Sequence, residues 1–151
     1  MIDVRILKKS VQGKKVLIDT NIIIYLTEET PRLHDLSMEL FSMIENGSGS
    51  GVISILSVSE VMMGPLRAGD VDTAMTVKNY LMNFPNIHCQ QITAEVLDLV
   101  GQDERVNWQI LRPLDALIIA SGLYARVDLF ISNDQHFINS LPSQKMISFN
   151  L

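Results

Sequence analysis

Features that the sequence lacks narrow the class of protein. Cys89 is the only cysteine among 151 residues, so the chain forms no internal disulfide, and its apolar neighbours favour a buried packing role over a nucleophilic one. No apolar run approaches the roughly 20 residues that a membrane-spanning helix needs. The basic residues within 1–15 precede no apolar segment of the signal-peptide kind, so we expect a cytoplasmic protein that does not enter a membrane.

An excess of positive charge is also missing. The net charge of −5 gives no support to nucleic-acid binding by bulk attraction, although it does not exclude a local basic surface. The three histidines, His34, His88 and His136, show no spacing typical of metal ligands. The glycine-rich residues 46–51 follow a predicted helix and open a strand, the reverse of a phosphate-binding loop, and no Ser-His-Asp arrangement, G-x-S-x-G or Walker A motif competes.

The hydrophobic content of 47% in a chain of this length predicts one folded domain, residues 1–151. Short apolar runs predict strands at 16–18, 52–55, 87–89, 128–131 and 146–149. Between them, we expect helices at 33–44, from an N-cap at Ser57 until Pro65 and Gly69, at 70–84, from Thr93 to near Trp108, and at 113–124. Residues 1–15 fit an extra strand or arm. The alternation predicts an α/β fold, a three-layer α/β/α sandwich with a central parallel sheet.

Four acids follow strands or begin helices in this scheme. Asp19 and Asp134 come after buried strands, and Glu60 and Asp115 lie in the first turns of helices. The carboxyl ends of parallel strands and the N-termini of the next helices share one edge of a sheet, so we expect the four acids in one cleft. Purely structural interpretations stay open, because Asp19 also suits a helix N-cap, Glu60 a capping box with Ser57, and Asp115 the helix dipole.

Clustered carboxylates repel one another, and a bound divalent cation is the usual relief. Oxygen ligands without cysteine or histidine partners favour Mg²⁺ or Mn²⁺ over zinc. Such an ion suits phosphoryl chemistry, because it activates water and steadies the attacking and leaving oxygens. The acids together therefore indicate metal-dependent hydrolysis of a phosphate ester.

Four stretches, each holding one of the acids, resemble the motifs of the PIN-domain family, in particular its small VapC-like ribonuclease toxins. They are Leu-Ile-Asp19-Thr-Asn21, Ser-Val-Ser-Glu60-Val with its continuation to residue 70, Leu-Asp115-Ala-Leu-Ile-Ile-Ala, and Phe-Ile-Ser132-Asn-Asp134-Gln-His136-Phe. The resemblance extends from about residue 16 to residue 137. It departs from the family at His136, where many members carry another acid.

The resemblance implies a PIN-like nuclease domain that cleaves RNA with Mg²⁺ or Mn²⁺. Asp19, Glu60, Asp115 and Asp134 would surround the metal, Ser132 would support them with its hydroxyl, and Asn21 would hydrogen-bond near Asp19. It also implies a toxin role, a small antitoxin that covers the acidic cleft, and a homodimer. Cleavage by metal-activated water would leave a 5′-phosphate and a 3′-hydroxyl.

Two other classes of function were weighed. A catalytically silent PIN-like module would bind RNA or a protein without cutting, and the intact set of four acids argues against it. A phosphatase with an aspartate nucleophile would need a second aspartate two residues after the first, and Asn21 occupies that position.

Overall fold

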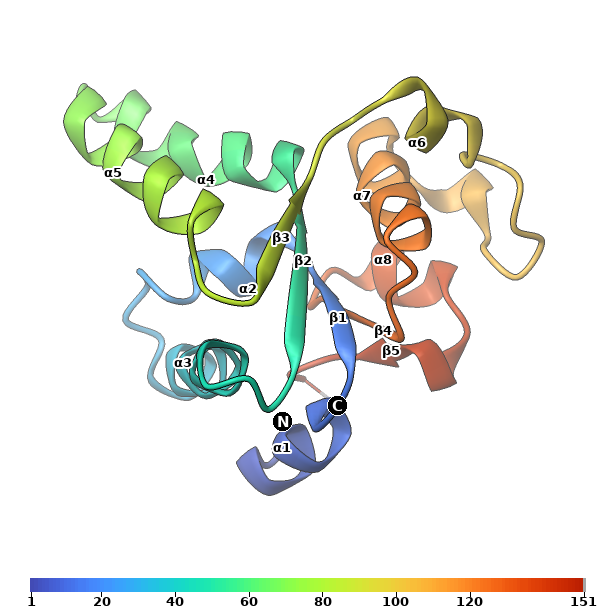
Figure 1. Cartoon of the computed structure of the whole chain (residues 1–151), viewed down its shortest axis with the longest axis horizontal. Helices are drawn as coiled ribbons and strands as arrows, with labels where there is room; N and C mark the ends of the chain where they lie inside the picture. Colours follow the sequence, from blue (N-terminus) through green and yellow to red (C-terminus); the bar gives the residue numbers. More distant parts are fainter. Residues whose placement is uncertain (151) are drawn as a thin grey trace.

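The structure is a computed structural model that describes residues 1–150, with strands and helices in alternation (Figure 1). The strands are β1 (Lys15–Ile18), β2 (Ser50–Ser54), β3 (Ile87–Gln90), β4 (Leu129–Ile131) and β5 (Met146–Ile147). The helices are α1 (Val4–Val11), α2 (Thr20–Ile24), α3 (Pro31–Glu45), α4 (Ile55–Arg67), α5 (Val71–Met82), α6 (Ala94–Asp98), α7 (Pro113–Tyr124) and α8 (Gln135–Ser140). Two 3₁₀ turns, η1 (Trp108–Ile110) and η2 (Ser143–Lys145), complete the set.

The strands form one parallel sheet in the order β3-β2-β1-β4-β5. The central strand β1 pairs with β2 on one side and with β4 on the other, and its Ile18 lies opposite Ile131 of β4. Side chains alternate along β1, so that Val16 and Ile18 enter one hydrophobic core and Leu17 enters another. A parallel strand that is buried on both faces explains the uninterrupted apolar run in the sequence.

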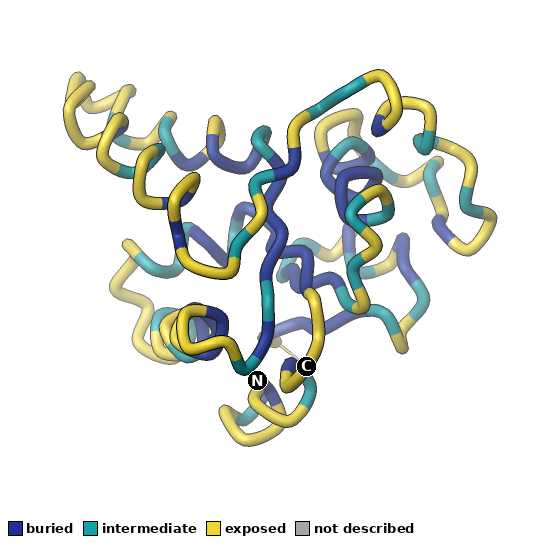
Figure 2. The backbone as a smooth tube through the Cα atoms, viewed as in Figure 1, coloured by how far each residue is buried: buried dark blue, intermediate teal, exposed yellow. Residues whose placement is uncertain are grey.

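Helices cover both faces of this sheet. The helices α2, α3, α4 and α5 lie on one side of it, and α6, α7 and α8 lie on the other (Figure 1). The central strands β1, β2 and β4 are largely buried, whereas the outer turns of α5 are exposed (Figure 2). This arrangement confirms the predicted α/β/α sandwich. Among the described residues, no helix combines the length and the apolar character that a membrane span requires.

The prediction of a strand or arm at the N-terminus was wrong. Residues 4–11 form the helix α1, which begins where the Asp3 carboxylate accepts a hydrogen bond of 2.6 Å from the backbone N–H of Arg5. Leu7 and Val11, one helical turn apart, are fully buried in the core that includes α3. The short mixed run fits a strand or a helix by its local pattern, and burial of this stripe selects the helix.

Two helix boundaries also differ from the prediction. The helix α4 begins directly after β2, because Ser54, and not Ser57, is the N-cap and its Oγ accepts a bond of 3.2 Å from Leu56 N–H. Pro65 lies within α4 instead of ending it, and the helix packs closely along α5. The helix after Thr93 ends at Asp98, and the chain turns at Gly101 with a φ of 86°, so Trp108 lies in η1.

Candidate active site

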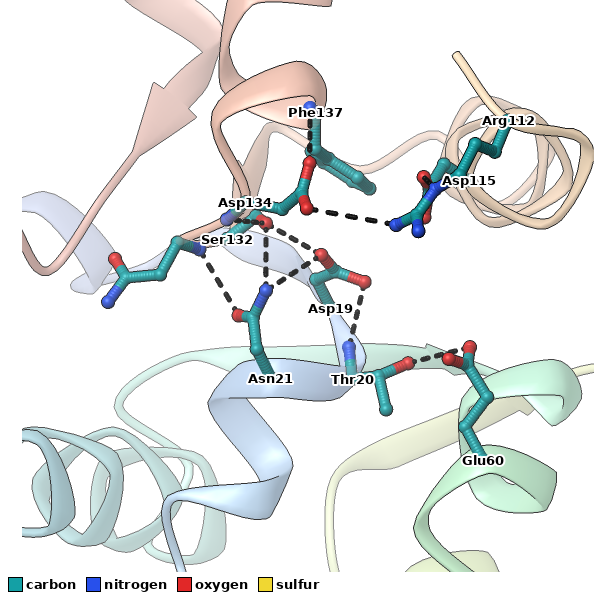
Figure 3. Close-up of polar contacts among 10 residues, drawn as sticks. Asp19, Thr20, Asn21, Glu60, Arg112, Asp115, Ser132, Asp134 and Phe137 are labelled. Atoms are coloured by element: carbon teal, nitrogen blue, oxygen red, sulfur yellow. Dashed lines mark hydrogen bonds and ion pairs between the residues drawn. The ribbon is translucent and has the colours of Figure 1, made fainter. Parts of the chain in front are cut away.

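The centre of the site is Asp19, at the carboxyl end of the central strand (Figure 3). Asp19 is 4% exposed and is the N-cap of α2, with Oδ1 accepting a hydrogen bond of 2.8 Å from Thr20 N–H. Its Oδ2 accepts a bond of 2.6 Å from the hydroxyl of Ser132, which follows the neighbouring strand β4. Both carboxylate oxygens of Asp19 are therefore fixed by hydrogen bonds, one from the helix that it caps and one from the segment after β4.

Burial changes the acidity of Asp19. Its pKa rises from 3.8 to about 6, mainly because burial penalises the charged form. The bonds from Ser132 and Thr20 lower the pKa in part, and the carboxylates of Asp115 and Glu60 raise it further. The ionised form of Asp19 is therefore destabilised in the metal-free folded chain. Such perturbed carboxyl groups are typical of functional sites.

Glu60 reaches the site from α4. It is exposed, and its Oε1 accepts a hydrogen bond of 3.0 Å from the hydroxyl of Thr20. The Thr20 hydroxyl also lies 2.9 Å from that of Ser57, which is fully buried in the same helix. Because α4 starts at Ile55, Glu60 lies in its second turn, and the predicted capping box with Ser57 does not form. Thr20 was not predicted as a site residue, although its place between Asp19 and Asn21 was a usable signal.

The other two acids face an arginine that the sequence reasoning did not identify. Asp115, in the first turn of α7, accepts a bond of 3.1 Å at Oδ2 from Nε of Arg112. Asp134 is the N-cap of α8 and accepts a bond of 3.0 Å from Phe137 N–H, and its other oxygen lies 3.8 Å from Nη2 of Arg112. The carboxylates of Asp115 and Asp134 raise the pKa of Arg112 above its ordinary value. The spacing of Arg112 and Asp115, three residues apart at a helix start, was the available sequence signal.

Two asparagines, Asn21 and Asn133, form hydrogen bonds that connect the segments after β1 and β4. The Asn21 amide nitrogen donates to Asp19 Oδ2 at 3.3 Å and lies 3.4 Å from Ser132 Oγ, and its oxygen accepts from Asn133 N–H at 3.1 Å. Asn133 in turn accepts from the Phe149 N–H at 2.8 Å, which ties the site to the C-terminal segment. Asn133 was not predicted as a site residue. His136 lies exposed in the first turn of α8.

The four acids lie at one edge of the sheet, the region called the acidic cleft below, without converging on one point (Figure 3). A cavity of about 340 Å³ lies between α4 and the start of α7 and is lined by Glu60, Arg112, Pro113, Leu114 and Asp115. Asp19 and Asp134 do not line this cavity, and Figure 3 shows the guanidinium of Arg112 between Asp115 and Asp134. Within residues 1–150, no three acidic, histidine or cysteine side chains lie close enough together to hold one ion. The donor set fits a hard divalent cation by its chemistry, since it offers carboxylate oxygens from four elements.

Fold and site together define a class: a parallel α/β/α domain with an acidic cleft at the carboxyl ends of its central strands. The PIN domain family model matches residues 16–139, and the chain belongs to this family. The match spans every acid of the cleft. No curated protein sequence matches the chain.

Several solved structures share this fold. VapBC2 from Rickettsia felis, bound to a DNA fragment from their promoter, superimposes with a TM-score of 0.66 at 13% identity, covering 89% of this chain and 98% of that chain. VapC20 from Mycobacterium tuberculosis, a sarcin-ricin-loop-cleaving toxin, gives 0.59 at 16% identity, covering 82% and 93%. FitAcB from Neisseria gonorrhoeae gives 0.61 at 16% identity, covering 89% and 96%. At these identities the likeness is one of fold.

Proposed function

We propose that the chain is an endoribonuclease that depends on Mg²⁺ or Mn²⁺. The observation that carries the proposal is the gathering of Asp19, Glu60, Asp115 and Asp134 from four separate elements in one cleft, together with the raised pKa of the buried Asp19. Membership of the PIN-domain family supports it. Four carboxylates beside the guanidinium of Arg112 leave an excess of negative charge, which favours the binding of a cation.

Each residue has a defined task in this proposal. Asp19, Glu60 and Asp115 would hold the ion, and Asp134 would complete the site or orient the attacking water. The ion, when bound, activates water and stabilises the charge of the phosphodiester oxygens. Ser132 and Thr20 N–H fix the two oxygens of Asp19, and the Thr20 hydroxyl orients Glu60. Protons and the ion would compete for Asp19, whose pKa is raised to about 6 in the metal-free chain, so we expect activity to fall on acidification.

Cleavage of a mixed RNA pool tests the proposal. Purified protein is incubated with Mg²⁺, Mn²⁺ or EDTA, beside Asp19→Asn and the control Asp103→Asn, an acid paired with Arg105 outside the cleft. We expect cutting that needs the metal, is lost in Asp19→Asn and persists in Asp103→Asn. Cutting that survives Asp19→Asn would contradict the proposal, and RNA binding without cutting would favour the silent binding module.

The cellular role we propose is that of a toxin in a toxin–antitoxin pair, a cytoplasmic homodimer held inactive by a small antitoxin over the acidic cleft. Its support is the shared fold with VapBC2, VapC20 and FitAcB. Induced expression should stop bacterial growth for the wild type and not for Asp19→Asn at equal protein levels. Light scattering of the purified chain tests the dimer, and a monomeric mass would reject it.

A further inference from the structure

The chain itself places a positive charge beside two of the four acids. Arg112 lies at the N-cap position of α7, and its guanidinium joins Asp115, at 3.1 Å from Nε, to Asp134, at 3.8 Å from Nη2. Asp115 lies in α7 and lines the same cavity as Arg112, whereas Asp134 is the N-cap of α8 and lies across from the guanidinium (Figure 3). The guanidinium therefore lies beside carboxylates that a divalent cation would also bind.

The two partners differ from Arg112 in exposure. The Arg112 side chain is 72% exposed, whereas the side chains of Asp115 and Asp134 are 12% and 29% exposed. The guanidinium thus reaches over its partners from the solvent side. An exposed ion pair of this kind is weak, and a long arginine side chain rearranges at little cost. A divalent ion competes well for the same oxygens, because it carries twice the charge and is compact.

We propose that Arg112 is a displaceable counter-ion: it neutralises Asp115 and Asp134 in the metal-free protein, and when a divalent cation takes these carboxylates it turns to a phosphate of the RNA. This inference rests on the proposed function. A freed guanidinium at the mouth of the cleft presents a planar set of donors that matches phosphate oxygens. Metal binding and RNA binding would then be coupled through one side chain, each strengthening the other.

The first measurement is calorimetric titration of the metal-free chain with Mn²⁺. It compares the wild type with Arg112→Ala, with Arg112→Met, which keeps a long side chain without the charge, and with Arg105→Ala. Arg105 is the matched control, since it is 67% exposed and pairs with Asp103 at 2.9 Å. We expect both Arg112 variants to bind Mn²⁺ about fivefold more tightly than the wild type, because Mn²⁺ no longer has to break one exposed ion pair. Arg105→Ala should bind Mn²⁺ as the wild type does.

The second measurement is RNA binding by fluorescence anisotropy with an RNA whose phosphorothioate linkages resist hydrolysis, so that every proposed metal ligand stays in place. A labelled mixed-sequence RNA is titrated with and without saturating Mn²⁺. The gain in RNA affinity from Mn²⁺ should be about fivefold smaller once Arg112→Met is added, because the guanidinium that the metal frees is then missing.

The outcomes separate this inference from the proposed function. Tighter Mn²⁺ binding in both Arg112 variants, with a reduced RNA gain, supports the inference. Unchanged Mn²⁺ affinity in both variants overturns the displaced counter-ion, and an equal RNA gain with and without Arg112 overturns its transfer to phosphate. If neither the wild type nor the Arg112 variants bind Mn²⁺, the proposed function itself is rejected.

Discussion

Replacing Asp19 with asparagine should stabilise the protein at neutral pH when EDTA removes divalent ions. Burial raises the pKa of Asp19 from 3.8 to about 6, so the folded chain holds a proton that the unfolded chain has lost between these two values. The stability of the wild type therefore falls as the pH rises through this window. The variant carries no charge at this position and avoids the loss.

The magnitude follows from the pKa difference. At about 1.4 kcal/mol for each pKa unit, the buried charge costs the wild type about 3 kcal/mol at pH 7.5 and about 1 kcal/mol at pH 4.5. The asparagine nitrogen cannot accept the bonds that Ser132 and Asn21 donate to Asp19 Oδ2, a loss of about 1 kcal/mol. We expect Asp19→Asn to be about 2 kcal/mol more stable than the wild type at pH 7.5 and about equal to it at pH 4.5.

Urea unfolding in EDTA at these two pH values measures the difference. The control is Asp103→Asn. Because Arg105 lowers the pKa of Asp103, replacing this aspartate should not stabilise the chain at neutral pH. A variant Asp19→Asn that is less stable than the wild type at neutral pH, or whose advantage does not change with pH, would refute the reasoning. Asp19→Asn should also lack nuclease activity, so the buried aspartate that lowers the stability of the wild type would be required for its activity.

Two further substitutions test the support around the site. Ser132→Ala removes the hydroxyl that donates to Asp19, so it should destabilise the chain by about 2 kcal/mol in urea unfolding and move the acid limb of the activity profile to higher pH. Gly122→Ala should cost about 1–3 kcal/mol, because its new Cβ would lie 2.5 Å from Cε1 of Phe130, whereas Gly64→Ala, in open space on a helix, should gain up to about 1 kcal/mol. A neutral Ser132→Ala, or equal effects at the two glycines, would contradict these assignments.

The sequence was sufficient to predict the sheet and the edge that holds the site. Buried runs such as the one that contains Val16 and Ile18 alternate with helical patterns, and only a parallel sheet covered on both faces accounts for them. The carboxyl ends of such strands lie together, so topology predicted Asp19 and Asp134 at one edge of the sheet, whereas Ser132 was expected there only from the family resemblance. The roles of the acids at that edge remain predictions.

Other features depend on tertiary packing that a local pattern does not contain. The helix α1 is selected by the burial of Leu7 and Val11, not by its propensity. Ser57 and Glu60 have the spacing of a capping box, but the helix begins three residues earlier, where Ser54 at the end of β2 is the N-cap. The bridge from Arg112 to Asp134 joins residues that are distant in sequence, and only the fold brings them together.

Isotope labelling of the cleaved ends tests the central claim most directly. The wild-type chain cleaves RNA with Mn²⁺ in ¹⁸O-labelled water, and mass spectrometry reads the products. Attack by metal-activated water predicts one solvent oxygen in a new 5′-phosphate, beside a 3′-hydroxyl, and no product with EDTA or Asp19→Asn. An unlabelled 2′,3′-cyclic phosphate would show that the 2′-hydroxyl of the RNA attacked instead, which would contradict the assignment of the acidic cleft as a metal-dependent hydrolytic site.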